Sequence, residues 1–113
     1  MEEKTVKVKV KNIAQSPLKL RLVADTVRGK NVSDALDILS LVQRKGAITV
    51  SKAIRSGIAN AREIHSVDEK DLTVDKINID EARILKRTRF QSKGRVSVIN
   101  KRRSHLNLEL KVK

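Results

Sequence analysis

Several kinds of residue are absent or scarce in this chain of 113 residues. It has no cysteine, tryptophan or tyrosine, and it has one phenylalanine, one proline and four glycines. Without cysteine there is no disulfide, no zinc–thiolate site and no thiol nucleophile. Apolar runs fall short of the roughly 20 residues that a membrane-spanning helix needs, and the acidic start fits neither a signal peptide nor a transit peptide. We therefore expect one soluble, intracellular domain.

Residue groupings typical of catalytic and metal sites are also lacking. The acids are scattered singly, the glycines lie far apart, and His65 and His105 are the only imidazoles. Ser104 and His105 are adjacent in a strand-like segment, so their side chains lie on opposite faces and cannot form a serine–base pair. The sequence therefore predicts no enzyme activity, no metal and no cofactor.

Positive charge is abundant and unevenly distributed. The 26 Lys and Arg against 13 Asp and Glu give a net charge of +13. Residues 1–30 contribute +5, residues 31–82 contribute −2 and residues 83–113 contribute +10, and no acid occurs between Ala82 and Arg103. A basic block interleaved with apolar residues is typical of an ordered segment that binds a polyanion, of which nucleic acid is the commonest.

The first periodic segment, residues 5–11, alternates valine with lysine and predicts a half-buried strand. Its three lysines, Lys7, Lys9 and Lys11, have two interpretations. They protect the edge of a sheet from aggregation, or they contact phosphates. A single strand does not decide between these interpretations.

Two short helices are predicted next. Ser16 and Pro17 are typical of an N-cap and of a first helical position, and Gly29 is typical of a helix stop. We expect Ser33 to cap the second helix, whose two acids near the positive end are structural.

A longer helix is predicted over residues 44–64. One buried stripe follows helical spacing and comprises Ala47, Val50, Ile54, Ile58 and Ala61. Gly57 lies in mid-helix, where the close approach of a neighbouring helix would explain it. A basic stripe comprises Lys45, Lys52, Arg55 and Arg62. That stripe is either a solvated face or a binding surface.

Two strands are predicted near the end of the chain. The alternation of residues 72–79 changes phase once, which indicates a bulge or a switch of faces, and residues 106–112 alternate cleanly. We expect these two runs to pair in antiparallel fashion around a hairpin, with residues 91–94 as its turn. Arms of about 15 residues reach roughly 50 Å, well beyond a core with a radius of gyration near 13 Å.

The kind of nucleic acid follows less directly. Base stacking on a sheet is excluded because Phe90 is the only aromatic residue. Arginine-rich segments without aromatics suit the phosphates and grooves of folded RNA or DNA. A general DNA-binding protein and a nucleic-acid-processing enzyme are the alternatives, although the latter lacks an acid cluster for metals.

Several motifs in order give the chain a family resemblance. They are Ser16–Asp25 with Arg28-Gly29-Lys30, Ala35–Leu39, Ala59-Asn60-Ala61, Val74–Ile77, Asp80-Glu81, Lys86-Arg87, Lys93-Gly94-Arg95 and Lys101–His105. Together they resemble the ribosomal protein L twenty-two family of the large subunit over nearly the whole chain. Departures from the bacterial pattern occur at Ala82-Arg83 and at Phe90-Gln91-Ser92.

The resemblance implies an α+β fold: a small globular domain of three helices and an antiparallel sheet (about 1–75 and 106–113) with a long projecting basic β-hairpin (about 76–105). It implies a structural constituent of the large ribosomal subunit that binds ribosomal RNA and supports early assembly in the cytoplasm. The globular domain would lie near the peptide exit tunnel and the hairpin would line its wall. Neighbouring ribosomal proteins and the nascent polypeptide would be further partners, without a membrane or a homo-oligomer.

The resemblance also implies a set of RNA-binding residues. In the hairpin they are Lys86, Arg87, Arg89, Lys93, Gly94, Arg95, Lys101, Arg102, Arg103, Ser104 and His105. In the globular domain they are Lys19, Arg21, Arg28 and Lys30.

Overall fold

The computed structural model describes residues 4–82, 85–90, 96–101 and 103–112, and within them three helices and five strands. In chain order these are β1 (Thr5–Ile13), α1 (Pro17–Asp25), α2 (Val32–Leu41), α3 (Lys45–His65), β2 (Leu72–Glu81), β3 (Leu85–Phe90), β4 (Val96–Lys101) and β5 (Ser104–Val112). A single 3-10 turn, Glu69–Asp71, precedes β2. The predicted α+β class is confirmed.

The last strand, β5, is the centre of a three-stranded antiparallel sheet, with β1 on one side and β2 on the other. Leu108 lies opposite Val8 of β1 and opposite Ile77 of β2, and all three side chains are buried. The clean alternation of residues 106–112 therefore sends every second side chain into the core. The predicted pairing of the two late strands is confirmed.

The change of phase in β2 is a bulge. The register shifts between Val74 and Lys76, so Asp75 is an extra residue opposite β5. Because of this extra residue, Val74 before the bulge and Ile77 after it both face the core. A second register shift lies in β1 between Val10 and Ile13, and the strand extends two residues beyond its predicted end.

The predicted N-cap is correct for α1 and wrong for α2. Ser16 caps α1 as predicted, and its side chain accepts a hydrogen bond from the Lys19 N–H. The N-cap of α2 is Asn31 instead of Ser33, because the Asn31 side chain accepts the bond from the Ser33 N–H at 3.0 Å. Helix α1 ends at Asp25, and Gly29 (φ +79°) lies beyond it in a turn whose N–H donates to the Val74 carbonyl.

The long helix α3 packs its predicted stripe of small and aliphatic residues into the core. Gly57 faces the sheet and not a neighbouring helix, which corrects the expectation. A Cβ at this position would lie 2.6 Å from Leu110 Cδ1 and 3.3 Å from Val8 Cγ2. The missing side chain therefore lets α3 approach β5 and β1 closely.

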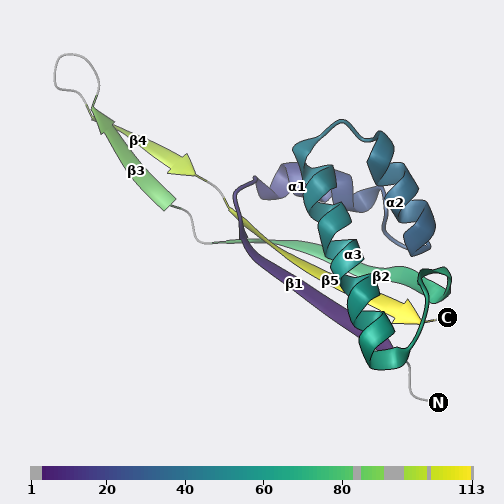
Figure 1. Cartoon of the computed structure of the whole chain (residues 1–113). Helices are drawn as coiled ribbons and strands as arrows, with labels where there is room; N and C mark the ends of the chain where they lie inside the picture. The colour runs from purple at the N-terminus through teal and green to yellow at the C-terminus, as the bar shows by residue number, and fades with distance from the viewer. Residues whose placement is uncertain (1–3, 83–84, 91–95, 102, 113) are drawn as a thin grey trace.

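The molecule is elongated. All three helices cover one face of the three-stranded sheet, and the β3–β4 ribbon projects from the end of the sheet opposite to the two termini (Figure 1). The radius of gyration is 17.3 Å, compared with about 13 Å for a compact domain of this length. The principal extents are 65, 28 and 18 Å. Within the described ranges, no helix has the length and apolar character to cross a bilayer.

Candidate nucleic-acid interface

The β3–β4 ribbon carries part of the predicted RNA-binding set. Its two strands pair in antiparallel register from Leu85 opposite Lys101 to Phe90 opposite Val96. Three predicted residues occupy positions in β3 and one ends β4: Lys86, Arg87, Arg89 and Lys101. The predicted turn at 91–94, which includes Lys93 and Gly94, lies outside the described residues, and so do Arg95 and Arg102. The ribbon thus places a basic stretch of sequence at a distance from the core.

The base of the ribbon is fastened to the end of β1 and to the connection that follows it. The Arg103 guanidinium donates from NH2 to the Asn12 carbonyl at 2.8 Å, and the Asn12 N–H donates to Nδ1 of His105 at 3.1 Å. Between them, the Ser104 hydroxyl donates to the Gln15 carbonyl at 2.7 Å. Asn12 has a left-handed backbone (φ 57°), and it lies where the register of β1 shifts. The consecutive residues 103–105 therefore hold the end of β1, where its register shifts, and the loop that leads from it to α1.

Ser104 is the only one of these three residues that is completely buried, at 0% exposure. Its predicted RNA contact stays a prediction, but its hydroxyl has a defined partner within the protein. The loss of that hydrogen bond would remove the donor that the Gln15 carbonyl has within the protein.

We expect Ser104→Ala to lower the free energy of unfolding by about 1–2 kcal/mol, because the hydrogen bond of a buried hydroxyl is lost. Urea unfolding followed by circular dichroism measures this change. Ser51→Ala in α3 is the control, since Ser51 makes no hydrogen bond with its side chain among the described residues, and we expect it to change stability by less than about 0.5 kcal/mol. Equal effects of the two substitutions would contradict the role assigned to the Ser104 hydroxyl.

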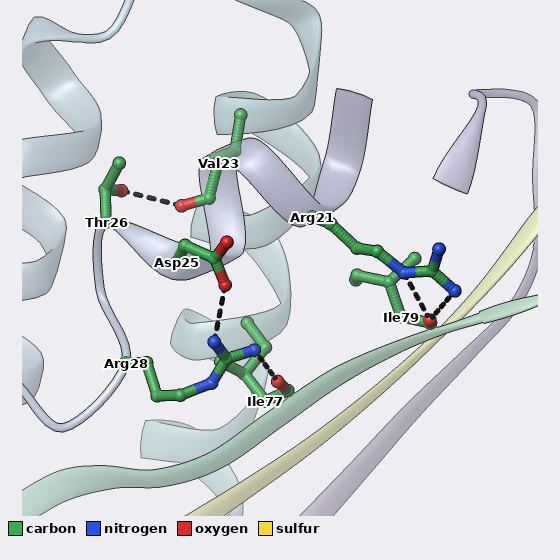
Figure 2. A network of polar contacts seen from close by, with 7 residues as sticks. All are labelled: Arg21, Val23, Asp25, Thr26, Arg28, Ile77 and Ile79. Carbon is green, nitrogen blue, oxygen red and sulfur yellow. Dashed lines mark hydrogen bonds and ion pairs between the residues drawn. The ribbon is translucent and has the colours of Figure 1, made fainter. Parts of the chain in front are cut away.

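Two predicted RNA-binding arginines, Arg21 and Arg28, lie against the outer edge of β2 (Figure 2). Arg21 donates from Nε and NH2 to the Ile79 carbonyl at 3.2 and 3.0 Å. Arg28 donates from NH2 to the Ile77 carbonyl at 2.7 Å and forms an ion pair with Asp25.

The turn after α1 completes the cover of this edge. The Gly29 N–H donates to the Val74 carbonyl at 2.9 Å, and the Val74 N–H donates to the Lys30 carbonyl at 2.8 Å. An exposed strand edge is a template for unwanted pairing, so side-chain and backbone donors at these positions close it. The sequence did not predict this role. The seven-residue spacing of Arg21 and Arg28 was the available signal, but it does not identify β2 as the partner.

The other predicted cations of the globular domain and the basic stripe of α3 are exposed. Lys19 and Lys30 are exposed, and so is the α3 basic stripe, Lys45, Lys52, Arg55 and Arg62. Among the described residues, none of these six makes an ion pair. The choice between a solvated stripe and a binding surface on α3 therefore stays open, and RNA contact by Lys19 and Lys30 stays a prediction.

The acidic and histidine side chains in the described part of the chain lie apart from one another. Within that part, no three His, Cys, Asp or Glu side chains are grouped to hold a metal ion. His65 ends α3, and His105 accepts a backbone hydrogen bond at the base of the ribbon.

Comparison with known proteins agrees with the resemblance found in the sequence. Residues 8–111 match the family model described as ribosomal protein L22p/L17e. Relatives from three strains of Dehalococcoides mccartyi, each named large ribosomal subunit protein uL22, are 47% identical to this chain over 103 residues. The alignment covers 91% of this chain and 94% of each relative.

Proposed function

Because this chain belongs to the ribosomal protein L22p/L17e family, we propose that it binds the RNA of the large ribosomal subunit, in which it is a structural constituent. The family consists of structural ribosomal proteins and not of enzymes, in line with the expectation from the sequence. Both the globular domain and the ribbon fall within the matched residues, so the proposal applies to the chain as a whole.

The observation that carries the proposal is the projecting basic ribbon. Residues 83–103 contain nine Lys and Arg and no acid, and β3 and β4 project from the sheet in a molecule 65 Å long (Figure 1). An isolated two-stranded ribbon is marginally stable in water, and a high density of one charge destabilises it further. An RNA surface supplies both the contact and the opposite charge that such a ribbon lacks.

The finer parts of the proposal follow from what the family resemblance implies. The globular part, about 1–75 and 106–113, lies near the exit of the peptide tunnel, and the arm, about 76–105, extends inward along the tunnel wall. The arm touches several RNA domains, its tip faces the nascent polypeptide, and neighbouring ribosomal proteins surround the globular part. The protein acts as a single copy in early assembly of cytoplasmic ribosomes.

The RNA-binding residues that we propose are, in the arm, Lys86, Arg87, Arg89, Lys93, Gly94, Arg95, Lys101, Arg102, Arg103, Ser104 and His105, and, in the globular part, Lys19, Arg21, Arg28 and Lys30. We assign most of the binding free energy to the cations, because phosphate neutralisation dominates affinity for nucleic acid. Arg103, Ser104 and His105 contribute chiefly by fastening the base of the arm, through the bonds to Asn12 and Gln15.

Competitive binding near physiological salt tests the proposal. A labelled domain of large-subunit ribosomal RNA is bound to the full chain and challenged with excess duplex DNA or transfer RNA. We expect the complex to survive a hundredfold excess of either competitor, which corresponds to a preference of about 2.7 kcal/mol. Equal displacement by both competitors would overturn the proposal and favour a general nucleic-acid-binding protein.

A further inference from the structure

The face of the sheet opposite to the helices is open and polar. No described helix or strand covers it (Figure 1). Two rows of side chains cross this face in register: Lys7, Glu109 and Lys76 in one row, and Lys9, Asn107 and Asn78 in the next. The three lysines and Asn78 are exposed, whereas Glu109 and Asn107 on the central strand are half-buried.

The two rows form the walls of a shallow hollow. Asn107 donates from Nδ2 to Oδ2 of Asp80 at 2.6 Å, so its Oδ1 atom is directed elsewhere. Glu109 forms no ion pair with Lys7 or Lys76 within the described residues. The hollow therefore has three lysines and Asn78 on its two outer strands, and Asn107 together with the Glu109 carboxylate on its central strand.

Protection of the sheet edges explains only part of this pattern. Strand β1 is an edge strand, so Lys7 and Lys9 on it are compatible with edge protection. Lys76 is on the opposite strand, β2, whose outer edge is already closed by Arg21, Arg28 and the Gly29–Lys30 turn. Lys76 is therefore not needed to protect the edge of β2. A lysine that faces the hollow without this protective role indicates a ligand of negative charge.

We propose that this open sheet face is a second RNA-binding surface, which takes the sugar–phosphate backbone. Lys7, Lys9 and Lys76 contact phosphates, and the amides of Asn78 and Asn107 form hydrogen bonds to backbone oxygens and hydroxyl groups. The face has no aromatic side chain, so it does not stack bases. The proposal rests on the ribosomal RNA-binding function proposed above.

The position of the face supports RNA as its occupant. Residues of β1, β5 and β2 line the hollow. Two of these strands, β2 and β5, lead toward the basic ribbon (Figure 1). A single body of folded RNA can therefore contact the ribbon and the sheet face together, so that the two surfaces act as one extended interface. An acidic protein segment would fit the lysines as well, and chemical protection of the lysines separates the two occupants.

Lysine acetylation of the full chain, read by mass spectrometry, tests the proposal with and without the large-subunit RNA domain. We expect RNA to protect Lys7, Lys9 and Lys76 at least severalfold more than Lys45, Lys52 and Lys70, which are exposed elsewhere on the domain. Protection of the sheet lysines by ribosomal proteins but not by RNA would overturn the proposal in favour of a protein partner.

A charge-matched pair of variants provides the second measurement. Replacement of Lys7, Lys9 and Lys76 by Gln should reduce the slope of log K against log salt by about three, one for each phosphate that is no longer neutralised. The control replaces Lys45, Lys52 and Lys70 by Gln and should change the slope by less than about one. If the wild-type protein prefers ribosomal RNA but the two variants give equal slopes, the sheet-face proposal is overturned. Loss of that preference would instead overturn the proposed function.

Discussion

Replacement of Lys86, Arg87, Arg89 and Lys101 by Gln should weaken binding to large-subunit RNA about a thousandfold at 0.1 M salt. Each phosphate contact contributes roughly 0.9 to the slope of log K against log salt, so the absence of four contacts removes about three to four orders of magnitude relative to 1 M salt. Two of the four cations, Lys86 and Lys101, lie near the base of the paired ribbon, and Arg89 lies near its tip. Titrations at several salt concentrations measure both the affinity and the slope.

The matched control for the arm is the basic stripe on α3. Substitution of Gln for Lys45, Lys52, Arg55 and Arg62 removes the same charge from exposed positions on a helix. We expect this control to lose less than about tenfold in affinity and to keep most of the slope. If the two variants lose affinity equally, the net charge of the protein and not the ribbon governs binding.

Leu110→Ala should strongly destabilise the fold, by about 2–5 kcal/mol, because Leu110 is fully buried at the centre of the sheet. Gly57→Ala should also destabilise, by about 1–2 kcal/mol. The added methyl group would lie 2.6 Å from Leu110 Cδ1, and this overpacking exceeds the gain of about 1 kcal/mol in helix propensity. The double variant should cost at least about 1 kcal/mol less than the sum, since the methyl group added at position 57 fills part of the space that the leucine leaves.

Urea unfolding followed by circular dichroism gives the three free energies, as the chain has no Trp or Tyr for fluorescence. Leu106→Ala provides the control for coupling. Leu106 is equally buried on the same strand, but it lies four residues from Leu110, or about 13 Å. Its effect should add to that of Gly57→Ala within about 0.5 kcal/mol. Strict additivity at Leu110 would contradict the contact between α3 and β5.

Local patterns predicted those features that neighbouring residues determine. Ser16 and Pro17 identified the start of α1, because capping depends on residues within one helical turn. The phase change in residues 72–79 identified the bulge at Asp75, because a period of two records which residues face the core. The start of α2 was placed incorrectly, since Asn31 and Ser33 are both good caps and their relative position in the turn decides between them.

Contacts across long sequence separations were not predictable in the same way. Arg21 and Arg28 satisfy carbonyl groups 58 and 49 residues further along the chain. Ser104 donates to Gln15, which is 89 residues earlier. A helical or strand pattern contains no information about which distant carbonyl will need a donor. Residues that resemble RNA ligands in sequence therefore proved to have intramolecular partners.

Charge and alternation along the chain were enough to predict a basic protein with a hairpin suited to a polyanion. The amount and order of charge are properties of the sequence, and they do not depend on packing. Folding decided the rest: α3 meets the sheet at Gly57, β2 has its outer edge closed by α1, and the opposite face of the sheet stays open. The physical reason is that burial and hydrogen-bond satisfaction are decided between distant segments, and they determine which cations are left to meet RNA.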